Sequence, residues 1–433
     1  MSSWATTAAT KPLRGTLQVA GDKSITHRAL ILGGLAQGET IISGYCLGED
    51  CLNTLRVVRA LGIPVEDIDT TSLRVLGKGL WGFTEPSTVL DCGNSGTGLR
   101  LLAGVLAGQD FFSVLTGDGS LRNRPMGRVV NPLRTMGASI TGRRAGEYAP
   151  LAIAGKGLQG CEYRSPVASA QVKSAILLAG LLAEGVTSVT EPVKSRDHTE
   201  RMLQHLGVDV QVDGCTVSVT GRRPFTGKPL SVPGDMSAAA FFLVAASIVP
   251  DSELWLSGIG INPARTGVVD ILNKMGANIQ VSNSREVSGE PVADILVKSA
   301  RLHGITIEAE DIPKTIDELP VLCVAAAAAE GQTHITGAQE LRVKETDRIH
   351  AMAVELSKLG ISIEENPDGL SITGGKRLTG AHCQSYGDHR VAMSLAVAGL
   401  IANSAIVIDE TDCIETSFPG FQGKLLDLLT NSQ

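Results

Sequence analysis

The feature that most constrains this chain is an internal repeat. An amphipathic stretch, a glycine and an alternating apolar run recur five times, at intervals of 69 to 84 residues. Glycine can end a helix in the left-handed conformation at little cost. Each copy therefore predicts a helix, a stop and a strand. The glycines that mark the stops are Gly62, Gly137, Gly207, Gly276 and Gly360.

A second kind of stretch, rich in Ala, Leu and Gly and apolar on nearly every side, occurs six times. Helices that are apolar all round are buried in the centre of a domain. We therefore predict six units of about 72 residues, each with a buried helix, a strand, an amphipathic helix and further strands. The last unit stops short, and a strand at residues 13–20 is expected to complete it. The buried helices are expected from Ala29, Leu99, Ala175, Ala238, Leu319 and Val391.

The repeats fall into two groups of three. Residues 17–24 and 230–237 match closely, and they open the first and the fourth unit. The predicted fold class is therefore α/β, with two domains of similar architecture. The expected bounds are 22–233 for one domain, 234–433 plus 1–21 for the other, and 20–22 with 232–235 for a hinge.

The composition excludes some classes of function. The net charge is −7, whereas a general binder of nucleic acid or anionic membranes would carry excess Lys and Arg, so neither partner is expected. The longest apolar stretches are about a dozen residues, short of the roughly 18 to 20 that span a bilayer. The first ten residues lack the basic region of a signal peptide, so we expect a frayed tail and a cytoplasmic protein.

The cysteines and histidines do not indicate a metal. The eight cysteines are scattered without any Cys-x-x-Cys pair, which indicates free thiols in a reducing compartment. His382, Cys383 and His389 lie close together, but the paired ligand spacings of tetrahedral sites are missing. No glycine-rich phosphate loop follows a predicted strand. We therefore expect neither a metal nor a nucleotide cofactor.

Each buried helix begins with a short polar motif. Helix starts offer unpaired N–H groups that attract phosphate or carboxylate, but Asp, Ser and Asn are also ordinary N-caps. The repeat supplies a control: residues shared between units favour capping, and residues confined to one unit favour chemistry. The shared residues are Asp22, Asp235 and Asp388, and Ser24 with Ser237.

Basic residues stand out by this test. The fourth unit has Met236 and Phe241 where the first has Lys23 and Arg28. If the motifs converge, their basic residues form an anion-selective cleft between the domains of an otherwise acidic protein. These residues are Lys23, Arg28, Arg100, Arg124, Arg196, Lys344, Arg348 and Arg390.

Acidic residues accompany the basic ones in the second half of the chain. Lys344 and Arg348 are four residues apart, so we expect them on one helix face beside Glu345. Asp317 and Glu318 precede an apolar run, residues 321–329, which contains no basic residue to pair with them. A carboxylate at a polar helix start is a candidate general base.

These motifs, taken in order, resemble one known family. Residues 21–28, 94–97, 124–125, 169–171, 342–348 and 387–390 are similar to those of the 5-enolpyruvylshikimate-3-phosphate synthases, the 3-phosphoshikimate 1-carboxyvinyltransferases, in their class II bacterial branch. The resemblance spans residues 11 to about 423. It implies a monomer of two domains, each an inside-out α/β barrel of three βαβαββ units with helices inside.

The resemblance also implies a reaction. The family transfers the enolpyruvyl group of phosphoenolpyruvate to the 5-hydroxyl of shikimate 3-phosphate and releases phosphate, in aromatic amino-acid biosynthesis. Asp317 would be the base at the hydroxyl, Glu345 the proton donor and acceptor at C3, and Lys23 an aid to phosphate departure. Contacts implied for shikimate 3-phosphate are Lys23, Ser24, Arg28, Ser169, Ala170, Gln171, Arg196, Asp317 and Lys344. Contacts implied for phosphoenolpyruvate are Lys23, Asn94, Gly96, Thr97, Arg124, Gln171, Lys344, Arg348 and Arg390.

Two details of the family pattern bear on ligands. Another branch carries a lysine just before its C-terminal Phe-Pro. In this chain the corresponding stretch, residues 415–419, contains no lysine. Gly96 stands where some class II members have alanine, so glyphosate is expected to compete with phosphoenolpyruvate.

Two other functions remain as alternatives. The sister enolpyruvyl transferases that act on UDP-N-acetylglucosamine carry a cysteine in the loop matching residues 117–127, and this loop has none. A non-catalytic anion-binding protein could share the repeats, but it would not need Asp317 and Glu345.

Overall fold

The six apolar stretches form buried helices in the computed structural model, which describes residues 2–430. In α8, for example, the residues from Met236 to Ser247 are buried without interruption. The prediction that these stretches lie at domain centres is confirmed. The helices are α1 (Lys23–Leu35), α3 (Gly96–Ala107), α6 (Ala170–Leu182), α8 (Met236–Ile248), α11 (Leu319–Ala328) and α13 (His389–Gly399).

The predicted glycine stops are also confirmed. Each glycine lies two residues beyond an amphipathic helix and has a φ between 80° and 98°, the left-handed conformation that favours glycine. The helices that end in this way are α2 (Glu49–Ala60), α4 (Gly127–Thr135), α7 (His198–His205), α9 (Gly267–Lys274) and α12 (Arg348–Lys358).

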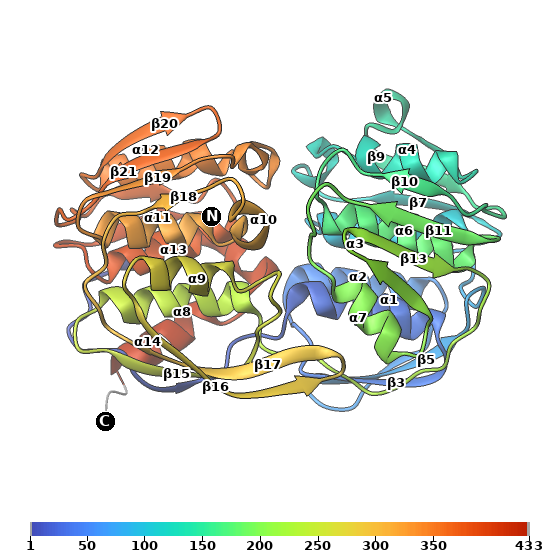
Figure 1. Ribbon diagram of the computed structural model, residues 1–433, viewed down its shortest axis with the longest axis horizontal. Coiled ribbons are helices and arrows are strands. Elements are labelled where there is room, and N and C mark those ends of the chain that lie inside the picture. Colours follow the sequence, from blue (N-terminus) through green and yellow to red (C-terminus); the bar gives the residue numbers. More distant parts are fainter. Residues whose placement is uncertain (1, 431–433) are drawn as a thin grey trace. The chain divides into compact units, whose positions relative to one another are not determined.

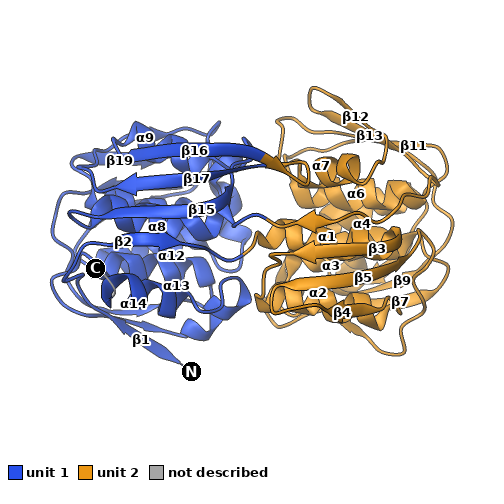
Figure 2. Cartoon of the chain, turned by 90° about the horizontal axis from the view of Figure 1, so that it is seen from below, with its two compact units in different colours: residues 1–20, 233–285, 291–433 blue, residues 21–232, 286–290 orange. Residues whose placement is uncertain are grey.

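The chain divides into two units, which Figure 2 shows in different colours. Unit 1 contains residues 1–20, 233–285 and 291–433, and unit 2 contains residues 21–232 and 286–290. The sequence prediction placed residues 286–290 in the domain of residues 234–433, which corresponds to unit 1. Residues 286–290 belong to unit 2 because they bond to it: Ser288 Oγ accepts a hydrogen bond from the backbone N–H of Ser231 at 2.9 Å.

Unit 2 contains three four-stranded sheets, in the orders β14-β3-β5-β4, β6-β7-β9-β8 and β10-β11-β13-β12. In each sheet the first two strands are parallel and the others are antiparallel. The strands are β3 (Gln37–Ser43), β4 (Val65–Asp67), β5 (Ser72–Lys78), β6 (Leu90–Asp91), β7 (Phe112–Thr116), β8 (Ser139–Gly142), β9 (Tyr148–Ala154), β10 (Glu162–Arg164), β11 (Val186–Thr190), β12 (Val210–Asp213), β13 (Thr216–Thr220) and β14 (Leu230–Ser231), with short helices η1 (Leu121–Asn123) and α5 (Arg143–Gly146).

Unit 1 has a similar plan, with two four-stranded sheets, β16-β17-β15-β2 and β18-β19-β21-β20, and one three-stranded sheet, β1-β23-β22. Its strands are β1 (Ser3–Thr6), β2 (Arg14–Leu17), β15 (Glu253–Gly260), β16 (Asn278–Val287), β17 (Glu290–Lys298), β18 (Thr306–Ile307), β19 (Gln332–Ile335), β20 (Ser362–Asn366), β21 (Gly369–Thr373), β22 (His382–Gln384) and β23 (Ile406–Asp409), with further helices α10 (Ile312–Thr315), η2 (Gln339–Val343), η3 (Thr411–Thr416) and α14 (Phe421–Thr430).

In each unit the buried helices lie inside and the sheets lie outside. Helix α3 packs against α6, and α11 packs against α8 and α13, as can be followed in Figure 1. Each unit has its own apolar core, which contains its three buried helices. The inside-out α/β architecture with βαβαββ repeats is therefore confirmed.

The N-terminal segment differs from the prediction in two ways. Strand β2 does not complete the sixth sheet, because it pairs in parallel with β15 of the fourth repeat. The first ten residues are not simply a frayed tail, because β1 pairs antiparallel with β23 and completes the sixth sheet instead. The sequence prediction failed here because the partners of these strands lie more than 200 residues away.

No helix within residues 2–430 is both long and apolar enough to cross a bilayer.

The pairing of β1 leads to a prediction about stability. Trp4 is 6% exposed, and its ring meets that of Phe421 edge-on at 6.1 Å. Trp4→Ala should lower the free energy of unfolding of unit 1 by about 3 to 5 kcal/mol, because it leaves a cavity in a packed core. Urea unfolding would measure this change. Ser3→Ala, on the exposed face of the same strand, is the control, and an equal effect of both substitutions would contradict the packing role.

Candidate active site

The starts of the buried helices meet within each unit, and most predicted site residues lie there. In unit 2, His27 Nε2 of α1 lies 3.2 Å from Ser95 Oγ at the start of α3, and Gln171 of α6 bonds to Thr97 of α3. In unit 1, Ser237 of α8 donates a hydrogen bond to Glu318, which precedes α11. We call these two groups of helix starts the unit 2 half-site and the unit 1 half-site.

The shared aspartates cap their helices, as predicted. Asp22 Oδ1 accepts from the N–H of Ile25 at 2.8 Å, three residues on, whereas Asp235 and Asp388 cap α8 and α13 by accepting from the N–H two residues on, also at 2.8 Å. The shared serine at the fourth repeat is not a cap, contrary to the prediction. Ser237 Oγ instead bonds to Glu318 and accepts from Arg265, so it belongs to a side-chain network.

Arg28 is a deeply buried cation of the unit 2 half-site, at 3% exposed. Its guanidinium donates to Thr199 Oγ1 at 2.7 Å, to Ser174 Oγ at 2.7 Å and to the carbonyl of Ser24 at 2.8 Å. Burial lowers the pKa of Arg28 to about 10, although Glu200 and Asp22 act in the opposite direction. Arg28 therefore stays protonated at neutral pH.

Lys23 and Asp50 form an ion pair at the start of α1. Lys23 Nζ lies 2.9 Å from Asp50 Oδ2, and the lysine side chain is 16% exposed. Asp50 lies in the first turn of α2. An incoming anion would share Lys23 with this carboxylate.

A second cluster surrounds the start of α3. Arg124 donates to Asn94 Oδ1 at 2.6 Å, and Arg100 donates to Gln171 Oε1 at 2.6 Å. Gln171 in turn donates to Thr97 Oγ1 at 2.9 Å. These side chains from the second and third repeats hold one another in place.

Gly96, the first residue of α3, lies against the two arginines of this cluster. A Cβ at this position would stand 2.8 Å from Arg100 Nη1 and 3.3 Å from Arg124 Nη1. A side chain here would therefore push at least one guanidinium aside, and glycine keeps both close to the helix N-terminus.

The third repeat contributes the start of α6 and the segment before α7. Ser169 is the N-cap of α6, and Ala170 is its first residue. Arg196 lies two residues before α7 and is partly buried. These residues belong to unit 2, together with Lys23 and Arg28.

Arg348 organises the unit 1 half-site. Its side chain is 1% exposed and lies 2.7 Å from Asp388 Oδ2, 2.7 Å from Glu345 Oε2 and 3.5 Å from Asp317 Oδ1. Burial alone would lower the pKa of Arg348, but the carboxylates of Asp388 and Glu345 outweigh it, and the pKa is raised. This arginine is a permanent cation that gathers three carboxylates.

Asp317, the candidate base, is surrounded by cations. Lys344 Nζ lies 3.6 Å from its Oδ1, and Arg390 Nη2 lies 4.0 Å from its Oδ2. Arg390 also donates to the carbonyl of Asp317 at 2.9 Å. The cations that surround this carboxylate thus come from segments that lie far from it in the sequence.

The prediction that Lys344 and Arg348 share one helix face is wrong. Helix α12 begins only at Arg348, with Asp347 as its N-cap, and Lys344 ends the preceding η2 in an extended conformation. The cap explains the difference, because Asp347 Oδ1 accepts from the N–H of His350 and starts the helix there. Both cations nevertheless approach Asp317.

Sequence reasoning missed Arg265. This residue is 2% exposed and donates to Asp235 Oδ1 and to Ser237 Oγ, both at 2.7 Å. Through Ser237 it reaches Glu318, which lies 3.9 Å from Arg390. A signal existed, because Arg265 stands two residues before α9 as Arg196 stands before α7.

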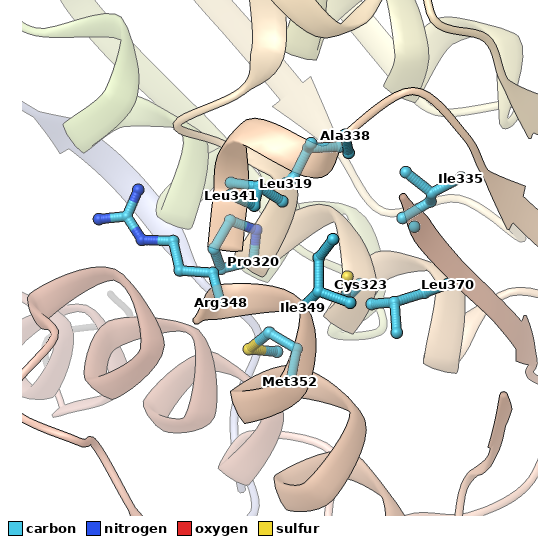
Figure 3. A pocket seen from close by; sticks show the side chains of 11 residues that line it. Leu319, Pro320, Cys323, Ile335, Ala338, Leu341, Arg348, Ile349, Met352 and Leu370 are labelled. Atoms are coloured by element: carbon cyan, nitrogen blue, oxygen red, sulfur yellow. The ribbon is translucent and has the colours of Figure 1, made fainter. Parts of the chain in front are cut away.

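A small cavity in the core of unit 1 adjoins this network, because Arg348 is among the residues that line it. It measures about 10 Å³ and is lined by apolar side chains such as Leu319, Cys323 and Leu370. Figure 3 shows the guanidinium of Arg348 pointing away from it. An apolar space that holds about one water and offers no polar partner stays empty, so the cavity is not a binding site.

Within residues 2–430, no group of three or more His, Cys, Asp and Glu side chains is arranged to hold a metal ion.

Comparison with known proteins identifies close relatives. Residues 7–425 match the family model described as EPSP synthase (3-phosphoshikimate 1-carboxyvinyltransferase). The chain is 57% identical to the 3-phosphoshikimate 1-carboxyvinyltransferase of Geotalea uraniireducens, over 94% of this chain and 95% of the relative. It is 59% identical to that of Gloeobacter violaceus, with the same shares of the two chains covered.

Solved structures are similar as well. EPSP synthase from Acinetobacter baumannii matches with a TM-score of 0.88 and 45% identity, over 99% of this chain and 97% of the other. The enolpyruvyl transferase NikO from Streptomyces tendae matches with a TM-score of 0.80 but only 18% identity, over 98% of this chain and 97% of the other. The second likeness supports the fold alone.

The buried His27 leads to a prediction about pH. Burial, with Lys23 and Arg28 nearby, lowers the pKa of His27 well below its usual value. In the unfolded chain this pKa is about 6.5, so below that pH the unfolded chain takes up a proton that the folded chain does not. The stability of unit 2 should therefore fall as pH drops below about 6.5.

Urea unfolding between pH 7.5 and 5.5 would measure the effect. His27→Asn should flatten the decline in stability, whereas the exposed His334→Asn should leave it unchanged. Equal pH dependence of the wild type and the His27→Asn variant would contradict the role of His27.

Proposed function

The chain belongs to the EPSP synthase family, and we propose that its two half-sites supply the residues that hold and activate the two substrates. The protein transfers the enolpyruvyl group of phosphoenolpyruvate to shikimate 3-phosphate in aromatic amino-acid biosynthesis. Both substrates carry several negative charges. The observation that carries the residue assignment is the setting of Asp317, a carboxylate among three cations at a helix start.

We assign shikimate 3-phosphate chiefly to the unit 2 half-site. Arg28 and Arg196 would pair with its phosphate, and Ser169 offers a hydroxyl beside the N-terminus of α6. Asp317 and Lys344 of unit 1 would approach the reacting 5-hydroxyl. The full set for this substrate is Lys23, Ser24, Arg28, Ser169, Ala170, Gln171, Arg196, Asp317 and Lys344.

We assign phosphoenolpyruvate to residues of both units. Arg124, held by Asn94, and the N–H groups at Gly96 suit one of its anionic ends. Arg348 and Arg390 suit the other. The full set is Lys23, Asn94, Gly96, Thr97, Arg124, Gln171, Lys344, Arg348 and Arg390.

The reaction is an addition followed by an elimination. The 5-hydroxyl oxygen bonds to C2 of phosphoenolpyruvate while C3 gains a proton, and the hydroxyl proton passes to Asp317. The tetrahedral intermediate then loses phosphate from C2 and a proton from C3, which restores the double bond. Lys23 would stabilise the charge on the departing phosphate.

Asp317 suits the role of base because its cations stabilise the carboxylate before the reaction. Glu345 must instead hold a proton to deliver it to C3. Its contact with Arg348 at 2.7 Å favours the carboxylate. We therefore propose that phosphoenolpyruvate, by engaging Arg348, weakens this contact and lets Glu345 take up the proton.

Three further parts of the proposal concern inhibition, assembly and location. Glyphosate, which carries a phosphonate and a carboxylate, would bind in place of phosphoenolpyruvate. The chain would act as a monomer. It would work in the cytoplasm, where a reducing environment keeps its eight cysteines free as they are here.

The role of Asp317 gives the first test. The wild type should release phosphate only when both substrates are present. Asp317→Ala should still bind shikimate 3-phosphate but lower kcat by about 100-fold to 10,000-fold, the usual contribution of a general base. A phosphate-release assay and calorimetry would measure the two effects.

The control for this test is Asp311→Asn, a carboxylate of unit 1 that pairs with Lys274 at 3.1 Å and lies outside the half-site. It should leave kcat unchanged. A near-normal kcat in Asp317→Ala would remove Asp317 from the role of base.

The contacts of Gly96 give the second test. Glyphosate should inhibit competitively against phosphoenolpyruvate, with an inhibition constant at or below the KM of that substrate. Gly96→Ala should raise both constants, because the added methyl group would stand 2.8 Å from Arg100 Nη1. Steady-state kinetics would measure both, and an inhibition constant far above the KM in the wild type would refute the prediction.

A further inference from the structure

A lysine and two glutamates lie buried behind the unit 2 half-site. Lys173, in the first turns of α6, is 1% exposed, and its Nζ lies 2.9 Å from Glu191 Oε2 and 2.7 Å from Glu200 Oε1. The two glutamate side chains are 2% and 3% exposed. We call these three residues the buried triad.

The triad is held together by charge. Burial alone would lower the pKa of Lys173, but Glu200 and Glu191 outweigh it, and the pKa is raised. Removing one member would leave a buried charge without its partner, which is strongly unfavourable. Apolar residues of similar size would fill this core without the cost of burying charges. The three charges therefore indicate a role that apolar residues could not fill.

Glu191 joins two segments of the half-site. Its Oε1 accepts from the N–H of Ser169 at 2.9 Å. Its Oε2 accepts from the N–H of Ser195 at 3.2 Å and from the hydroxyl of Ser195 at 2.8 Å. Ser169 caps α6, and Ser195 immediately precedes Arg196. One carboxylate thus fixes the start of α6 and the segment that carries Arg196.

The other members of the triad lie beside the contacts of Arg28. Glu200 follows Thr199, and Lys173 precedes Ser174. Thr199 and Ser174 are the side chains that accept from the guanidinium of Arg28, and their hydroxyls lie 2.7 Å apart. The triad therefore lies beside the segments that carry Ser169 and Arg196. It also lies beside both side-chain partners of Arg28.

The internal repeat shows that the fold does not require this charge. Lys173 stands four residues after the capping residue of its helix. In the other buried helices with a side-chain cap, the same position is Thr26, Leu99, Ala239 or Ala392. The scaffold accepts uncharged side chains there four times, so the lysine serves something specific to the third repeat.

We propose that the buried triad positions Ser169, Arg196 and Arg28 and thereby sets the affinity for shikimate 3-phosphate. Lys173, Glu191 and Glu200 do not touch the substrate and are positioning residues. This inference rests on the proposed function, because it takes those three residues as ligands of shikimate 3-phosphate.

Glu191→Gln is the main test. Its carboxylate accepts from the N–H of Ser169 on one side and from the N–H of Ser195 on the other, beside the ammonium of Lys173, so the amide NH2 of glutamine must point at a donor on one side. Titration calorimetry should show shikimate 3-phosphate binding at least about tenfold more weakly. The KM for shikimate 3-phosphate should rise in parallel, while the KM for phosphoenolpyruvate and kcat stay within about threefold of the wild type.

Three further variants test the inference even if Glu191→Gln does not fold. Ser195→Ala removes one hydrogen bond of Glu191 and no charge, and it should weaken shikimate 3-phosphate binding about threefold. Lys173→Arg keeps the charge and should bind more tightly than Lys173→Met. An unchanged affinity in Ser195→Ala, or equal affinities of the two Lys173 variants, would overturn the inference even if Glu191→Gln does not fold.

The matched control is Glu355→Gln in unit 1. Glu355 is fully buried and pairs with Lys358 at 2.9 Å. Its substitution should lower Tm but leave the affinity for shikimate 3-phosphate unchanged. An equal loss of affinity in this variant would show that Glu191→Gln acts through general destabilisation and would overturn the inference.

Arg196→Gln separates this inference from the proposed function. If it binds shikimate 3-phosphate as the wild type does, the proposed ligand set is wrong. If it binds more weakly while Glu191→Gln binds normally, the ligand set stands and the positioning role of the triad is refuted.

Discussion

The architecture depends on the need to bury helices that are apolar on every side. A helix such as α8, buried from Met236 to Ser247, has no face to offer to water, so sheets must enclose it. In each unit three such helices pack together and their polar starts meet, as the contacts of Gln171 with Thr97 and of Ser237 with Glu318 show. Unpaired N–H groups and the positive ends of three helix dipoles are thereby gathered at one place.

Such a place attracts anions, and the protein partly neutralises it with its own carboxylates. Asp50 holds Lys23, and Asp388 with Glu345 holds Arg348. Multiply charged substrates would compete for these cations, so binding and the freeing of a carboxylate are linked. The carboxylates that gain or lose a proton in the proposed reaction, Asp317 and Glu345, are both among those held by Arg348.

The sequence was sufficient for features that are local or that the repeat displays several times. The glycine stops, the buried helices and the aspartate caps are of this kind. Features that depend on distant partners were missed: β1 needs β23, and the triad joins Lys173 to Glu191 and Glu200. Lys344 was placed in a helix because spacing alone does not show where a cap begins one, and in the structure Asp347 does so. The residues themselves indicated the anion-binding cations and the candidate base Asp317, whereas the two substrates and the assignment of residues to each came from the family resemblance.

The two units share one scaffold but differ in charge. The half-site of unit 2 collects Lys23, Arg28, Arg100, Arg124 and Arg196, and its nearest carboxylates lie beside or behind these cations. The half-site of unit 1 instead interleaves cations with Asp317, Glu318, Glu345 and Asp388. A surplus of fixed cations suits holding an anion, whereas paired acids and bases suit moving a proton. The same scaffold thus provides two similar helix-start platforms, and they differ in charge at a few positions, such as Lys173 of the third repeat against Ala392 of the sixth.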